Sequence, residues 1–106
     1  MFDAFEVSLE LVRSLRTPCA VIRRADPKLY TQIRAAATSI PLNLAEGRRR
    51  SGKDRKHFWR IAAGSAAEVR AALLTAEAWG DLQPRHAGQS LALIDRVLAM
   101  TWAMTR

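Results

Sequence analysis

The sequence is poor in the residues that make crosslinks, tight turns and membrane spans. Cys19 is its one cysteine among 106 residues, so an internal disulfide is excluded. Five glycines and four prolines leave little material for loops, and no stretch approaches the roughly 18 uninterrupted apolar residues that a membrane span requires. The first residues also lack the basic segment and apolar core of a secretory signal. These absences predict a cytoplasmic protein that does not contact a membrane.

The residues that are abundant favour helices. Alanine, leucine and arginine are frequent, and β-branched residues are few. A chain of this length has room for one hydrophobic core, so we expect one domain over residues 1–106. Apolar residues spaced three and four apart predict helices over about residues 3–24, 27–46, 52–79 and 85–105. Short turns between them predict an all-α fold, an antiparallel up-down-up-down four-helix bundle.

Prolines and short polar side chains mark where these helices bend and begin. Pro18 lies inside the first predicted helix, so we expect a bend one turn before it. Asp26 followed by Pro27 is typical of an N-cap and a first helical position. Ser51 with Asp54 three residues later is typical of a capping box and predicts the start of the third helix.

The register between helices 27–46 and 52–79 predicts which small residues meet. If the turn is centred near residue 50, positions whose numbers sum to about 100 lie level with each other. Gly64 and Ser65 are then expected opposite Ala36 and Ala37. Small side chains on both helices would allow a close approach of the two backbones.

The same register predicts two structural ion pairs. Glu68 comes within reach of Arg34, and Glu46 comes near Lys56 or Arg60. The two glutamates lie at different heights of an antiparallel pair, which is poor geometry for shared acid–base catalysis. We therefore interpret both as ion-pair partners.

Three other residues of this region are expected to be structural. Pro41 removes the usual donor to the carbonyl of Ala37, and that carbonyl is a candidate partner for the Asn43 amide. Gly47 is expected to take the left-handed conformation that closes a helix.

The positive charge is concentrated at one turn. Residues 48–60 carry seven basic side chains and one acid, and the rest of the chain balances to +1 of a total of +7. Such a patch attracts polyanions. The residues predicted to contact phosphates are Arg48, Arg49, Arg50, Lys53, Arg55, Lys56 and Arg60. The alternative interpretation is a solvated surface, or ion pairs to a neighbouring subunit.

No arrangement in the sequence predicts catalysis, a metal site or a cofactor. His57 and His86 lack a second ligand at helical spacing. Ser65 has no histidine placed to activate it, and Cys19 lies on an apolar stripe, where a thiol behaves as a small hydrophobe.

Oligomerisation is expected on separate grounds. Helix 85–105 is apolar around much of its girth, and aromatic side chains crowd helix 52–79. A helix at the surface of one core needs only one apolar face, so a second apolar face on this helix predicts a contact with a partner subunit.

The motifs of residues 28–80 resemble a known protein family. They comprise Gln32–Ala36, Ser39–Pro41 with Asn43, Ala45–Gly47, and Phe58 with Ile61–Ala62, Gly64–Ser65 and Glu68. They are similar to the four-helix bundle proteins associated with intervening sequences in bacterial 23S rRNA genes. The resemblance implies a bacterial cytosolic protein that assembles as a ring-like homopentamer without enzymatic activity. A related branch serves as an accessory protein to reverse transcriptases.

The expected function is weak binding of RNA or DNA by the basic turn, with little sequence preference. The alternative is a scaffold or accessory subunit that binds a protein partner such as a polymerase. Leu42, Arg70 and the arginine-rich turn depart from the family pattern, and Arg70 weakens any argument for an acidic site.

Overall fold

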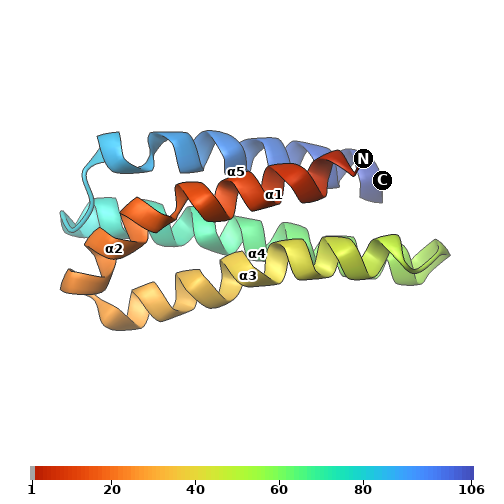
Figure 1. Ribbon diagram of the computed structural model, residues 1–106, viewed down its shortest axis with the longest axis horizontal. Helices are drawn as coiled ribbons and strands as arrows, with labels where there is room; N and C mark the ends of the chain where they lie inside the picture. The colour runs from red at the N-terminus through yellow and green to blue at the C-terminus, as the bar shows by residue number, and fades with distance from the viewer. Residues whose placement is uncertain (1) are drawn as a thin grey trace.

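The chain folds into helices that run along the long axis of a rod-shaped molecule (Figure 1). The computed structural model describes residues 2–106, and within that range it contains five α-helices and no β-strand. The helices are α1 (Asp3–Ser14), α2 (Arg16–Ala25), α3 (Pro27–Arg48), α4 (Gly52–Trp79) and α5 (Pro84–Thr105). The extents are 43 × 22 × 20 Å. None of the helices in this range combines the length and apolar character needed to cross a membrane.

The segment predicted as one helix over residues 3–24 is broken in two. The N–H of Leu15 is shared between the carbonyls of Leu11, at 3.0 Å, and Val12, at 3.2 Å. Pro18 follows in the first turn of α2 and has no N–H to offer the preceding turn. The predicted bend is therefore confirmed, and the structure has five helices where the sequence predicted four.

Two of the predicted helix starts differ in how they are capped. Asp26 caps α3, because its Oδ1 accepts a hydrogen bond from the N–H of Leu29 at 3.0 Å, and Pro27 is the first helical residue. Ser51 also precedes its helix as predicted, but its side chain makes no capping hydrogen bond. The predicted capping box is therefore absent at α4.

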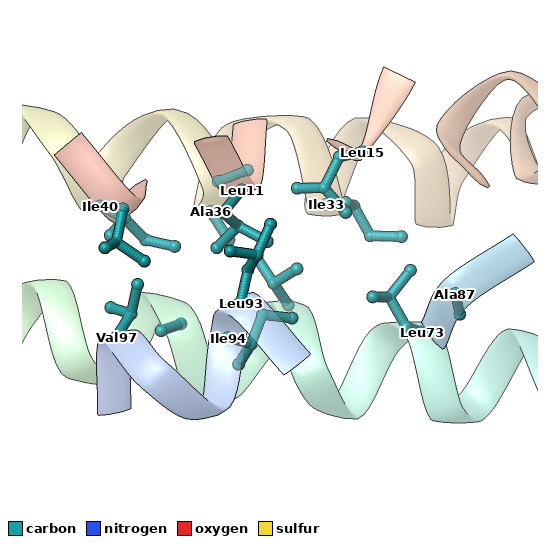
Figure 2. Close-up of a cluster of buried hydrophobic side chains, with 14 of the residues drawn as sticks. Leu11, Leu15, Ile33, Ala36, Ile40, Leu73, Ala87, Leu93, Ile94 and Val97 are labelled. Atoms are coloured by element: carbon teal, nitrogen blue, oxygen red, sulfur yellow. The ribbon is translucent and has the colours of Figure 1, made fainter. Parts of the chain in front are cut away.

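The core runs along the rod and is mainly apolar, with Ser8, Ser90 and Thr101 as its buried polar residues within the described chain. Figure 2 shows side chains of α1, α3, α4 and α5 meeting at its centre. Fully buried examples are Leu11, Ile33, Ile40, Leu73, Ile94 and Val97. The most extensive contact between two helices joins α3 and α4. This pair positions the turn that carries the basic residues.

The register between α3 and α4 differs from the predicted one. The Ser65 hydroxyl lies 2.9 Å from that of Ser39, so the facing positions sum to about 104 instead of 100. Gly64 is exposed, and a Cβ added there would meet no atom within 4 Å. The prediction that Gly64 faces α3 is therefore wrong. The small side chains buried in this region are Ala36, Ala37, Ala62 and Ala66.

Helix α5 uses both of its apolar sides within the chain. It contacts α1 as well as α4. Leu93, Ile94 and Val97 are buried, and Met100 and Met104 pack partly buried against the core. The predicted second apolar face of α5 therefore packs within the same chain, since α5 contacts α1 as well as α4. The wide apolar surface of α5 does not by itself require a partner subunit.

Candidate nucleic-acid interface

The predicted phosphate-binding residues gather at one end of the rod. Figure 1 shows the α3–α4 turn extending past the adjacent ends of α1 and α5. We call this end the basic tip and define it by the seven predicted residues, namely Arg48, Arg49, Arg50, Lys53, Arg55, Lys56 and Arg60. Some of these side chains bind other parts of the protein, and the others are exposed to solvent.

Arg55 and Trp59 hold the end of α3 against α4. Arg55 donates from Nε to the carbonyl of Gly47 at 3.2 Å and from Nη2 to that of Arg48 at 3.0 Å. The second bond satisfies a carbonyl at the end of α3, and the first adds to the hydrogen bond that the Gly47 carbonyl already accepts from the N–H of Arg50 at 3.1 Å. The Arg55 guanidinium also lies 5.5 Å from the centre of the Trp59 ring, and Trp59 Nε1 donates to the Leu44 carbonyl at 3.2 Å.

Gly47 permits this packing, but not in the predicted way. It lies within α3 and does not adopt a left-handed conformation, so that prediction is wrong. A Cβ added at Gly47 would lie 2.5 Å from Cδ1 and 2.6 Å from Nε1 of Trp59. Close approach of the indole therefore requires glycine here.

Two further residues of the tip hold the end of α5. Lys56 Nζ donates to the carbonyl of Arg106 at 3.1 Å, and Arg60 Nη2 donates to that of Thr105 at 3.2 Å. Cations are favourable at the C-terminus of a helix because of its dipole. Lys56 and Arg60 therefore stabilise the contact of α4 with α5, and neither pairs with Glu46 as predicted.

Glu46 instead pairs within the tip. Its Oε2 accepts a hydrogen bond of 2.8 Å from Arg50 Nε, and its Oε1 lies 4.0 Å from Arg49. The hydrogen bond from Arg50 holds the pKa of Glu46 below its ordinary value and raises the pKa of Arg50. The interpretation of Glu46 as an ion-pair partner is confirmed, with different partners.

The remaining cations face solvent. The Arg49 side chain is 80% exposed, and Lys53 makes no ion pair or hydrogen bond with any residue of the described chain. Arg48 is exposed and stacks over the ring of Phe2 at 5.2 Å. Arg48, Arg49 and Lys53 are therefore the side chains best able to contact an external anion.

The family motifs meet in a small polar network between α3 and α4. The Ser39 hydroxyl accepts a hydrogen bond from the Ser65 hydroxyl and another from Nδ2 of Asn43, each at 2.9 Å. Asn43 Nδ2 also donates to the Ser39 carbonyl at 2.9 Å. Pro41 is buried beside them, and α3 continues through it. Asn43 is structural as predicted, but its partner is Ser39 and not the carbonyl of Ala37.

The predicted pair of Arg34 and Glu68 does not form. Both residues are exposed, and the three ion pairs within residues 2–106 involve neither. In the observed register Glu68 is level with Ala36, two positions from Arg34, so the two residues are separated by the face of α3 that Arg34 occupies and not by height. The guanidinium of Arg34 lies near Cys19 instead, on the side of α3 that faces α2.

The structure reveals a second basic region that the sequence analysis missed. Residues 11–34 contain six basic side chains and one acid, Asp26. The sequence analysis summed the charge of all residues outside 48–60. In that sum the acids outside residues 11–34 cancel the positive charge of residues 11–34. A charge count in shorter windows would have found it. Figure 1 places α2 at the opposite end of the rod from the basic tip.

Two tryptophans add exposed apolar surface, Trp79 at the end of α4 opposite the basic tip and Trp102 near the end of α5 that Lys56 and Arg60 bind. Trp79 is 75% exposed at the end of α4, and Trp102 is 68% exposed on α5. Neither contributes to the core of this chain. Trp59 alone of the three is packed into the molecule.

The comparison with protein families identifies the chain. The family model described as 23S rRNA-intervening sequence protein matches residues 3–103, which is nearly the whole chain. No curated protein matches it significantly. The match includes α1 and α5 as well as the motifs of α3 and α4. The chain therefore belongs to the family of 23S rRNA-intervening sequence proteins.

Proposed function

We propose that this protein is a non-enzymatic nucleic-acid-binding protein whose basic tip contacts RNA or DNA weakly, with little sequence preference. The observation that carries the proposal is the gathering of seven cations on a turn that extends past its neighbouring helices. The side chains of three of them, Arg48, Arg49 and Lys53, are exposed and make no hydrogen bond within the described chain, and Arg49 has only a 4.0 Å contact with Glu46. Charges of this kind give salt-dependent binding through the phosphate backbone.

We propose further that the chain acts as a homo-oligomer, a ring-like homopentamer of four-helix bundles in the bacterial cytoplasm. Helices α1 and α2 would together form one arm of each bundle. The exposed Trp79, Trp102 and Leu42 supply apolar surface for contacts between subunits. Repetition of the tip in a ring would add weak phosphate contacts through effective concentration.

The test of nucleic-acid binding reverses the charges of two exposed side chains that make no hydrogen bond to α4 or α5. The double variant Arg49→Glu/Lys53→Glu should weaken binding of a labelled single-stranded 20-mer RNA in fluorescence anisotropy. The slope of log affinity against log salt should become less steep by about 1.4, or ~0.7 for each lost contact with a single strand. Arg50 and Arg55 are avoided because they hold the turn together.

The matched control is Arg85→Glu/Arg96→Glu, which makes the same change in charge at two exposed positions of α5. It should leave the salt slope unchanged. Equal affinity of the tip variant and the unaltered protein would remove the proposal.

The second candidate function is a scaffold or accessory subunit that binds a protein such as a polymerase. The exposure of Trp79 and Trp102 favours it, since tryptophan is enriched at protein interfaces. A variant with both replaced by Ser should lose a partner captured from the native cell while keeping RNA affinity. Light scattering separates the assembly itself, with 11.8 kDa expected for one chain and about 59 kDa for five.

A further inference from the structure

The second basic region forms a surface on α2 and its neighbours. We call it the α2 face and define it by its six basic residues, Arg13, Arg16, Arg23, Arg24, Lys28 and Arg34. All six are exposed, and none takes part in the ion pairs of the described chain. The one acid among residues 11–34, Asp26, is occupied as the cap of α3, and Glu10 lies one turn before Arg13 on α1. The local charge of +5 is therefore unneutralised, and it attracts anions.

Two hollows adjoin on this face. A pocket of about 150 Å³ lies between the α1–α2 break and α3, with Leu15, Tyr30 and Ala37 among its walls and Arg16 and Arg34 among its charged residues. A more open hollow runs along α1 and α2, where Arg13, Arg16, Thr17 and Arg24 line it. Arg16 belongs to both. The apolar pocket and the open hollow with its arginines therefore adjoin at Arg16.

The walls of the pocket are mainly apolar and are held in place. Leu15 and Ala37 are buried in the core, and the Tyr30 ring lies under the Arg23 guanidinium, whose Cζ is 5.2 Å from the ring centre. The half-buried Cys19 thiol also lines the pocket. Burial raises the pKa of Cys19, and the nearby charge of Arg34 acts in the opposite direction.

The size and charges of the pocket together specify its ligand. This pocket is open on one side, and its volume of about 150 Å³ has room for one aromatic ring. Guanidinium groups bind phosphates through planar, paired donors, and Arg16 and Arg34 lie at this pocket. A flat six-membered ring flanked by phosphates is a pyrimidine nucleotide within a strand. A duplex hides its bases in the stack, so the strand must be single.

We propose that the α2 face binds a single-stranded oligonucleotide, with one pyrimidine base in the pocket and the flanking phosphates on Arg16 and Arg34. The strand continues along the hollow past Arg13 and Arg24. This site is separate from the basic tip, and it rests on the proposed function only in using the same class of ligand.

Cys19 provides a direct reporter, because it is the one cysteine of the chain and it lines the pocket. The rate of its alkylation by N-ethylmaleimide is measured with and without the trinucleotide UUU. A trinucleotide has phosphates only on either side of its middle base, so with that base in the pocket and its phosphates on Arg16 and Arg34 none is left for the basic tip. At ten times its dissociation constant, bound UUU should slow alkylation about tenfold.

Three comparisons define the ligand in the unaltered protein. AAA should protect Cys19 less than UUU, because a purine exceeds the pocket, and an abasic trinucleotide should protect least. Comparing UUU with its deoxy counterpart shows whether the sugar matters, and protection by either supports the site. Equal protection by UUU and the abasic strand would overturn the base pocket. Protection by a Glu-rich peptide containing Phe, but by no oligonucleotide, would show that the ligand is an acidic peptide.

Two double variants separate this site from the basic tip. Arg16→Glu/Arg34→Glu should abolish protection by UUU, with far-ultraviolet circular dichroism as the check of folding. Arg49→Glu/Lys53→Glu should leave protection intact. The reverse pattern would assign the contact to the tip and overturn the inference, while leaving the proposed function standing. Absence of protection by every trinucleotide would overturn it even if the tip binds RNA.

Discussion

At the scale of single residues, Gly47 shows how one missing methyl group determines the end of α3. We expect Gly47→Ala to destabilise the protein, although alanine improves helix propensity by about 1 kcal/mol. The new Cβ would force Trp59 away and break its hydrogen bond to Leu44. Overpacking costs ~1–3 kcal/mol and the lost hydrogen bond ~0.5–1.5 kcal/mol. Urea unfolding should therefore show a net loss of about 1–3 kcal/mol.

Gly64 provides the matched control on the neighbouring helix. It also lies inside a helix, but it is exposed and has open space around it. Gly64→Ala should raise the free energy of unfolding by about 1 kcal/mol. If both variants gained stability, the packing of Trp59 on Gly47 would be contradicted.

The pairing of Glu46 with Arg50 makes a small part of the stability depend on pH. Because the pKa of Glu46 is lower in the folded chain than in the unfolded one, the pair stabilises the fold above the unfolded value. That contribution is lost as the pH falls through the lowered, folded value. Glu46→Gln should therefore be slightly less stable than the unaltered protein at neutral pH and equal to it in acid. A constant difference from neutral to acid pH in thermal unfolding would contradict the pairing.

At the scale of helices, the network of Ser39, Asn43 and Ser65 joins α3 to α4. Ser39→Ala and Ser65→Ala should each destabilise the protein, and the double variant should cost less than their sum. The coupling energy from chemical unfolding is expected to be ~0.5–1.5 kcal/mol, the usual net value of one hydrogen bond. Thr75, which bonds only to Ala71 of its own helix, is the control. Pairing Thr75→Ala with Ser39→Ala should show no coupling.

The elements that sequence patterns predicted well are those fixed by local chemistry. Asp26 and Pro27 begin α3 as predicted, and Pro18 bends the first segment, because caps and prolines act within one turn. The predicted ion pair of Glu68 with Arg34 was wrong because it depended on which faces of α3 and α4 meet. Arg34 lies on the side of α3 that faces α2, which the pattern of α3 and α4 alone does not show.

The candidate site was predicted in part for the same reason. Charge density along the sequence located the basic tip, but it did not show that Arg55, Lys56 and Arg60 would bind backbone carbonyls. The pocket beside Cys19 needs residues from α1, α2 and α3 together. Only the packing of these helices brings Arg16 close to Arg34.

At the scale of the whole molecule, the two cationic surfaces are electrostatically independent. They lie apart along a rod whose longest extent is 43 Å, because α2 is at the end opposite the tip and about 14 residues of α3, or ~21 Å at 1.5 Å per residue, separate Arg34 from Arg48. Screening in solution of physiological ionic strength acts over about 8 Å, so a charge at one end has little direct effect at the other. Any coupling between the ends must therefore come from a ligand long enough to contact both.

Strand length should consequently decide how the two surfaces combine. Even at the stacked spacing of ~3.4 Å per phosphate, about 13 nucleotides cover the length of the rod, so a 20-mer contacts both surfaces. A trinucleotide has too few phosphates to do so. For the 20-mer, Arg49→Glu/Lys53→Glu should lower affinity at least tenfold, and Arg16→Glu/Arg34→Glu should do the same, because either change removes the gain from effective concentration. For UUU, only the second variant should matter. Fluorescence anisotropy with each labelled strand measures these affinities. If Arg49→Glu/Lys53→Glu lowered the affinities for the 20-mer and for UUU equally, simultaneous contact with both surfaces would be contradicted.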